Sequence, residues 1–296
     1  MFSEAYKTAA QFTLPIVLSR KTLGGICSSG IGTHVVINDE GWIITAYHMV
    51  KMFQEASQEA DHVKDIKRQV QAIESDISLD KHAKRKAIKK LPVLHNGLTE
   101  QCSAWWGILT KGVTISEFRG IPTIDLAIGK LEDFDPKIIK QYPVFKDPSK
   151  NFDTGTSLCK LGFPFHSINP VWDDSIMGFK LPPGSLPLPL FPIDGIYTRN
   201  AEVKINNNPP PFPLLYLETS TPGLRGQSGG PIFDRKGTIW AIQSKTVHLP
   251  LGFDPEVPNS GGRKEHQFLN VGWGIHSQTI ISFLQLNKIK FNLSDY

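Results

Sequence analysis

Residues 32–50 read GTHVVINDEGWIITAYHMV: an apolar run, a polar turn at Asn38 to Gly41, and a second apolar run. Two apolar runs joined by such a turn are typical of a β-hairpin. The second run ends at His48, so a histidine directly follows a strand that we expect to be buried. Because a strand fixes the backbone, it can aim an imidazole at a reacting group. The stretch therefore predicts a β lobe that carries a positioned histidine.

Short apolar segments separated by glycine and proline recur along much of the chain. Residues 121–131 (IPTIDLAIGKL), 157–165 (SLCKLGFPF) and 230–247 (GPIFDRKGTIWAIQSKTV) have this character. Short strands at such spacing favour an all-β fold built from barrels or sandwiches. The proline-rich stretches 181–192 and 206–213 are predicted as surface loops, because proline cannot donate a hydrogen bond within a sheet.

One segment, residues 51–91, breaks the β pattern, because it is highly charged and nearly free of glycine and proline. Apolar residues spaced three and four apart place one stripe along a helix: Val63, Ile66, Val70, Ile73 and Ile77. A turn near residues 78–80 precedes a second helical stretch. We therefore predict a helical hairpin inserted into the first β lobe, and a last helix over residues 276–287.

The second half of the insertion is strongly basic, with the sequence KHAKRKAIKK over residues 81–90. Such a cluster is typical of a solvated helix face, and it also suits an acidic partner surface. Because the hairpin follows His48, we hypothesise that a regulatory protein partner bound to residues 51–91 biases the geometry of that histidine.

Composition limits the classes of protein that need to be considered. The chain has 296 residues, 40% of them hydrophobic, and a net charge of +4, which argue against global disorder and against strong attraction to nucleic acid or membranes. Its three cysteines form no disulfide or metal-binding pattern. No apolar run approaches the length of a membrane span, and the N-terminus does not resemble a signal peptide. These features favour a cytoplasmic protein.

The most specific motif is Gly226-Gln227-Ser228-Gly229-Gly230-Pro231. A serine on a glycine-lined turn can attack a carbonyl without a side-chain clash, and the N–H groups of Gly226 and Ser228 can converge on the oxyanion. An ordinary glycine-rich β-turn is the alternative interpretation. A nucleophilic serine needs a base, which His48 supplies, and Asp125 lies among apolar residues where a carboxylate needs a partner.

With His48 in TAYH, Asp125 in DLAI and Ser228 in GQSGGP, the chain resembles the trypsin-like serine peptidases. It is most similar to the bacterial high-temperature-requirement (Deg-type) branch, over residues 14–50 and 113–284. The resemblance implies a double six-stranded β-barrel: a first lobe at 1–135, a linker at 136–154 and a second lobe at 155–296. It also implies a His48, Asp125, Ser228 triad, an acyl-enzyme intermediate, and no metal or cofactor.

The chain departs from its secreted relatives at Gln227, where they carry an aspartate that pairs with a newly formed N-terminus. No cysteines flank His48, and no peptide-binding PDZ module is expected. The resemblance places nine residues at the substrate pocket: Pro222, Gly223, Leu224, Arg225, Ser244, Lys245, Thr246, Gly272 and Gly274. None of them is acidic, so we expect a small or medium apolar residue before the scissile bond.

Three functions fit these motifs. The first is a serine endopeptidase with restricted protein substrates and partner-dependent control. The second is a catalytically silent trypsin-like fold that acts as a scaffold through its helical insertion. The third is an esterase, because the same acyl chemistry serves amides and esters.

Overall fold

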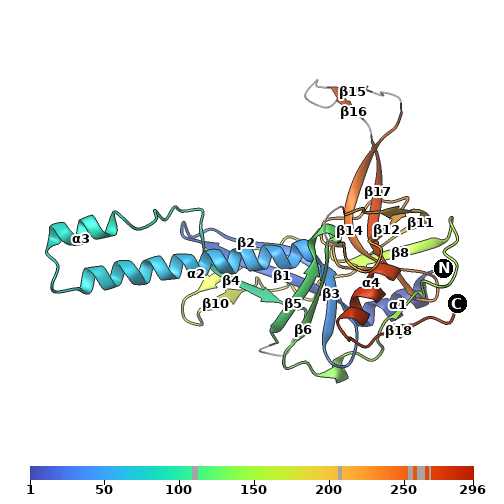
Figure 1. Ribbon diagram of the computed structural model, residues 1–296, viewed down its shortest axis with the longest axis horizontal. Coiled ribbons are helices and arrows are strands. Elements are labelled where there is room, and N and C mark those ends of the chain that lie inside the picture. Colours follow the sequence, from blue (N-terminus) through green and yellow to red (C-terminus); the bar gives the residue numbers. More distant parts are fainter. Residues whose placement is uncertain (109–112, 206–208, 253–255, 259–263, 267) are drawn as a thin grey trace.

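The computed structural model describes residues 1–108, 113–205, 209–252, 256–258, 264–266 and 268–296 (Figure 1). Two β-sheet units form the body, and a helical arm projects from it. The helices are α1 (Ser3–Phe12), α2 (Tyr47–Ser75), α3 (Lys81–Ile88), α4 (Ser277–Leu286) and two short 3-10 helices, η1 (Pro122–Ile124) and η2 (Pro136–Ile138).

The first sheet has the strand order β4-β1-β2-β3-β6-β5. Its strands are β1 (Thr13–Thr22), β2 (Cys27–Val36), β3 (Trp42–Ala46), β4 (Thr99–Trp105), β5 (Ile115–Ile121) and β6 (Leu126–Leu131). The predicted hairpin is confirmed as β2 and β3. Its turn is held by Asn38, whose Oδ1 accepts the N–H groups of Glu40 and Trp42, and by Gly41 at φ 82°.

The second sheet has the order β13-β8-β11-β12-β17-β14-β7-β18, and β13 also pairs with β14. This extra pairing closes six strands into a barrel. The strands are β7 (Val144–Phe145), β8 (Ser157–Gly162), β11 (Phe191–Glu202), β12 (Leu215–Thr219), β13 (Pro231–Phe233), β14 (Ile239–Pro250), β17 (Phe268–His276) and β18 (Asn292–Leu293). Two smaller ribbons pair β9 (Val171–Asp173) with β10 (Gly178–Lys180) and β15 (Glu256–Pro258) with β16 (Lys264–His266). The mostly-β fold is thus confirmed.

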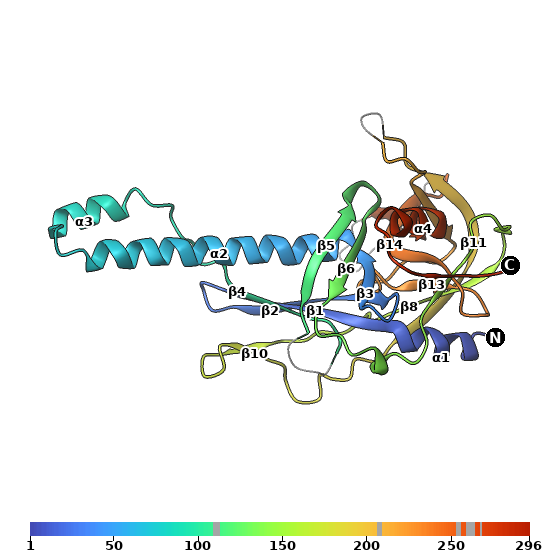
Figure 2. The same ribbon diagram turned by 60° about the horizontal axis from the view of Figure 1, so that its bottom comes forward.

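Both ends of the chain pack on the body, away from the arm (Figure 2). The N-terminal helix α1 was not predicted, and Phe2 just before it stacks edge-on against Phe233 of the second sheet. The predicted C-terminal helix is confirmed as α4. After it, the chain returns to the first sheet, where Asn38 Nδ2 donates to the carbonyl of Lys290 at 2.9 Å. The terminal segments therefore tie the two sheets together.

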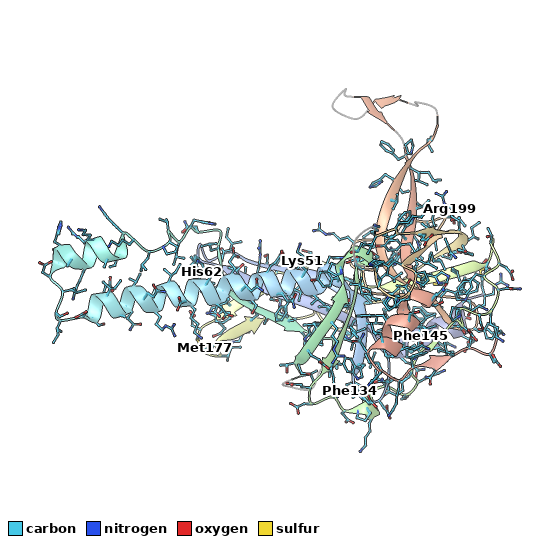
Figure 3. The ribbon with its side chains drawn as sticks, viewed as in Figure 1. Lys51, His62, Phe134, Phe145, Met177 and Arg199 are labelled. Atoms are coloured by element: carbon cyan, nitrogen blue, oxygen red, sulfur yellow. The ribbon has the colours of Figure 1, made fainter. Side chains whose placement is uncertain are left out.

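The helical insertion is confirmed, but its helix begins at Tyr47, directly after β3, rather than at residue 51. Only the first part of the predicted stripe is covered: Val63 and Ile66 are buried next to β4, whereas Ile77 lies beyond the end of the helix and is fully exposed. Helix α3 has no buried residue. Figure 3 shows Lys51 where α2 leaves the body and His62 along the arm. The hairpin therefore has too little facing apolar surface to bury its own stripe.

The proline-rich stretch 181–192 is a loop except at its end. Phe191 and Pro192 begin β11 and lie opposite Gly162 and Leu161 of β8. The loop prediction was wrong there, because proline is tolerated near the first residue of a strand. In the stretch 206–213, residues 206–208 lie outside the described residues, and residues 209–213 form no strand.

The three cysteines are unpaired, and of these only Cys159 is buried. Within the described part of the chain, no group of three or more His, Cys, Asp or Glu side chains could hold a metal ion. None of the helices in that part is long and apolar enough to cross a membrane.

Candidate active site

The sequence suggested that Asp125 lies inside a buried strand, but the structure places it just before one. It follows η1 in the left-handed conformation (φ 58°) and immediately precedes β6. Its main-chain carbonyl accepts the N–H of Tyr47 and its Oδ1 accepts the N–H of His48, both at 2.8 Å. Because Ala46 before α2 has no capping side chain, Asp125 caps this helix from the residue between η1 and β6.

The same carboxylate holds the ring of His48. Nδ1 of His48 lies 2.9 Å from Oδ2 and 3.1 Å from Oδ1 of Asp125, and Ser244 of β14 donates its hydroxyl to Oδ2 at 2.6 Å. Burial raises the pKa of Asp125, but the hydrogen bond and charge of His48 and the Ser244 hydroxyl outweigh it and lower that pKa below its usual value. A charged Asp125 favours the proton on Nδ1, which leaves Nε2 free to accept one.

The turn that carries Ser228 packs against the first sheet. The carbonyl of Ser228 accepts the N–H of Thr33 in β2 at 2.9 Å. The next residue, Gly229, has φ 87°, and a Cβ there would lie 2.0 Å from the carbonyl oxygen of Thr33. Only glycine fits this contact, so the glycine that follows the serine is required by the packing of the two sheets.

Two N–H groups of this turn are unused. Those of Gln227, Gly229 and Gly230 donate to main-chain carbonyls, whereas among the described residues those of Gly226 and Ser228 have no acceptor. Gly226 has φ 98°, a conformation that glycine adopts at little cost. Two free N–H donors beside a serine hydroxyl can donate hydrogen bonds to an oxyanion and stabilise its negative charge.

Gln227 is fully buried and braces the turn without an ion pair. Its Oε1 accepts the N–H of Leu224 at 2.9 Å, and its Nε2 donates to the carbonyl of Phe191 at 3.3 Å. The Gln227 amide thus stabilises the turn through two hydrogen bonds, one from each of its polar atoms.

His48 and Ser228 line one cavity of about 240 Å³. The other lining residues are Gly223, Leu224, Arg225, Gln243, Ser244, Lys245 and Thr246. Among the described contacts, Ser228 Oγ bonds only the carbonyl of Ser244, at 3.4 Å, and is not bonded to His48. Hydrogen bonds of this kind are often long without substrate and shorten when it binds.

A family model described as a trypsin-like peptidase domain matches residues 32–242, which include His48, Asp125 and Ser228. The chain belongs to the trypsin-like peptidase family. The resemblance drawn from the motifs is thereby confirmed, and this trypsin-like peptidase is a serine-type hydrolase.

Solved structures similar to this trypsin-like peptidase include the Rv3671c protease of M. tuberculosis. Its active form is 11% identical in sequence and has a TM-score of 0.48, and the match covers 98% of this chain and 86% of the protease chain. An inactive form is 12% identical and has a TM-score of 0.44, and the match covers 95% of this chain and 91% of the protease chain. A search of curated proteins finds no match.

The predicted pocket residues of this trypsin-like peptidase separate into two groups. Six of them line the cavity, whereas Pro222, Gly272 and Gly274 are not among its lining residues. Gln243 lines the cavity and was missed by the sequence analysis. Its Nε2 donates to the carbonyls of Lys245 and Trp273, and its buried Oε1 has no partner in the described structure. A strand irregularity between Gln243 and Lys245 accompanies this arrangement, and residue alternation does not reveal it.

Lys160 was also missed, because it sits in an apolar strand segment. Its side chain is fully buried, and Nζ donates to the carbonyls of Thr221 and Pro222, the latter at 2.9 Å. Burial lowers the pKa of Lys160 to about 7. A Cβ at Gly272 would lie 2.7 Å from this nitrogen, so the glycine makes room for it. Lys160 thus fixes the chain that leads into the pocket wall.

Proposed function

We propose that this peptidase is an endopeptidase that cleaves peptide bonds with Ser228 as nucleophile, His48 as general base and Asp125 as the residue that orients the base. One observation carries the proposal: the ring of His48 is hydrogen-bonded to the Asp125 carboxylate and lines the same cavity as Ser228. A histidine held by a carboxylate, lining one cavity with a serine in a trypsin-like peptidase, supports these three roles.

The chemistry follows from these groups. Ser228 Oγ attacks the scissile carbonyl while His48 Nε2 takes its proton, and Asp125 stabilises the resulting imidazolium. The free N–H groups of Gly226 and Ser228 bind the oxyanion. The C–N bond then breaks as His48 protonates the leaving amine. Water, activated by His48, hydrolyses the acyl-enzyme and restores Ser228.

The acyl part of the substrate lies along residues 244–246, whose backbone can pair with an extended peptide. Gly223, Leu224 and Thr246 line the cavity, which has no acidic residue and a volume of only about 240 Å³. These properties support a small or medium apolar residue before the scissile bond and a restricted set of substrates.

Control by a protein partner is part of the proposal. The arm helix α2 begins at Tyr47 and contains His48, and the basic helix α3 at its end has no buried residue. A partner bound to the arm therefore acts on the helix that carries the base. Deleting residues 70–92 is expected to leave active-site labelling of the pure protein intact and to change it in extract of the source organism. Identical labelling of both forms in that extract would contradict partner control.

The triad is tested by covalent labelling with a fluorophosphonate probe, read by intact mass. The wild type is expected to gain one adduct, and Ser228→Ala and His48→Ala none. An unlabelled wild type would support the catalytically silent scaffold. The observation that favours this alternative is that Ser228 Oγ bonds the carbonyl of Ser244 rather than His48. If the wild type is labelled and hydrolyses esters but no peptide, the esterase alternative is supported.

A further inference from the structure

A second cavity adjoins the catalytic one. It has a volume of about 480 Å³ and lies between the base of α2 and strands β1, β2 and β4. Arg225 lines both cavities. The residues that matter below are Leu18 of β1, Gly30 of β2, and Met52, Phe53 and Ala56 of α2. The helical insertion therefore builds one wall of a cavity that adjoins the catalytic one at Arg225.

The position of this cavity suits the leaving-group side of a bound peptide, that is, the residues that follow the scissile bond. Residues 244–246, where the acyl part lies in the proposed function, line only the catalytic cavity. Strand β2 passes directly beside Ser228, because Thr33, which lies within that strand, donates its N–H to the Ser228 carbonyl. Gly30 lies three residues from Thr33 along this strand, a span of about 10 Å or three residues of extended peptide. A peptide that crosses Ser228 thus reaches the second cavity two or three residues after the scissile bond.

The cavity has a mixed lining, in which apolar side chains of β1 and α2 are accompanied by charged ones that include Glu55 and Arg225. Two of the charged side chains are partly engaged within the protein: Glu59 Oε2 accepts the N–H of Thr99 at 2.8 Å, and Arg20 Nε donates to Ser28 at 3.2 Å. Met52, by contrast, is 49% exposed although it is a large apolar side chain. A half-exposed methionine beside a hollow provides an adaptable surface for an apolar ligand.

Gly30 leaves the hollow open. A Cβ at this residue would lie 3.6 Å from Met52 Cε, an ordinary contact, and Gly30 does not have a positive φ. A larger side chain at Gly30 therefore projects toward Met52 without a backbone clash. This gives a way to fill the cavity while the triad stays intact.

We propose that the cavity beneath the base of α2 is a binding site for an apolar side chain of the substrate, two or three residues after the scissile bond. The proposal rests on the proposed function, because it assigns the specificity of the same reaction. The helical insertion then has a direct part in substrate choice in addition to any role in partner binding.

Acyl transfer tests this site without knowledge of the natural substrate. The full-length protein is acylated with p-nitrophenyl acetate, and the tripeptide amides Ala-Leu-Leu-NH2 and Ala-Ser-Ser-NH2 compete with water for the acyl-enzyme. The amine nitrogen attacks the acyl carbon, the bond to Ser228 Oγ breaks, and His48 returns the proton to that oxygen. The ratio of acylated peptide to acetate reports how well each amide binds on the leaving-group side.

For the wild type, we expect the leucine peptide to be acylated about tenfold more efficiently than the serine peptide, the scale of discrimination by an apolar pocket. Gly30→Leu is expected to abolish this preference, and Met52→Ala to reduce it. Gln54→Ala, on the same helix but outside the cavity, is the matched control and is expected to keep it. Acylation of every variant by the ester shows that the triad is intact.

Equal acceptance of the two peptides by the wild type would overturn the proposal, as would a preference that survives in Gly30→Leu. Failure of the wild type to be acylated at all would instead count against the proposed catalytic function. The two failures are therefore distinguishable in a single experiment.

Discussion

Asp125 holds His48 twice: one carboxylate oxygen accepts the main-chain N–H of His48 at 2.8 Å, and the other lies 2.9 Å from the ring Nδ1. The same residue therefore caps the arm helix and orients the imidazole. Ser244, from the second sheet, donates a third hydrogen bond to this carboxylate. The start of the arm and the alignment of the base thus depend on a single side chain fixed between the two sheets.

Asp125→Asn keeps an oxygen that can cap α2 but loses the charge that fixes the proton on Nδ1. We expect kcat to fall roughly 10⁴-fold, as loss of the orienting carboxylate does in this type of triad. Ser244→Ala removes one hydrogen bond to a charged group, worth about 1.5–3 kcal/mol, and is expected to cost roughly 10- to 100-fold. Single-turnover acylation by a p-nitrophenyl ester measures both. Equal losses of rate in the two variants would contradict the prediction that the Asp125 charge orients His48 while Ser244 only adds a hydrogen bond to that carboxylate.

Lys160 should make stability depend on pH. Its pKa is lowered to about 7 in the folded protein from an ordinary 10.5, so between these values the unfolded chain binds more protons. The free energy of unfolding therefore rises with pH in this window, by up to about 1.4 kcal/mol per pH unit, and the full cost of a buried charge remains below it.

Urea denaturation of the wild type and Lys160→Met between pH 7 and 9 measures this dependence. The range ends at the ordinary thiol pKa of 9.0, because at higher pH the Cys159 thiol, with its pKa raised to about 12, opposes the effect. The wild type is expected to gain stability relative to Lys160→Met as pH rises. Lys150→Met, at an exposed site, is the control and should give a constant difference from the wild type. A constant difference for Lys160→Met would show that the amine is not titrating there.

Gly229→Ala should disrupt the nucleophile turn, because its Cβ would lie 2.0 Å from the Thr33 carbonyl oxygen. We expect a loss of more than about 2 kcal/mol of stability and loss of fluorophosphonate labelling. Gly155→Ala is the matched control, since Gly155 also has a positive φ, 90°, but open space around it. It should cost only about 1–2 kcal/mol and leave labelling intact. Thermal melts and labelling of both variants distinguish a clash from backbone strain.

The base of the arm is part of the folded core, and its tip is not. Ile66 is 3% exposed and Ile77 is fully exposed. Ile66→Ala is expected to destabilise the protein by about 2–5 kcal/mol, and Ile77→Ala by less than about 0.5 kcal/mol. Chemical denaturation compares them. Equal losses would mean that the tip is covered in solution.

The family and the three candidate triad residues could be predicted from the sequence, because motifs such as TAYH, DLAI and GQSGGP are local and occur in a fixed order. Hairpin turns were predictable for the same reason, since Asn38 and Gly41 act within a few residues of themselves. The terminal helix α4 followed from its apolar periodicity.

Only the tertiary structure decided what depends on contacts between distant segments. The cap that Asp125 places on α2 joins residues 77 positions apart, and Lys160 meets carbonyls more than 60 positions away. The burial of Ile66 and the exposure of Ile77 follow from where the body ends, not from helical periodicity. Sequence patterns determine local conformation and chemical type, whereas the catalytic cavity and its neighbour beneath α2 arise from segments that lie far apart in the sequence.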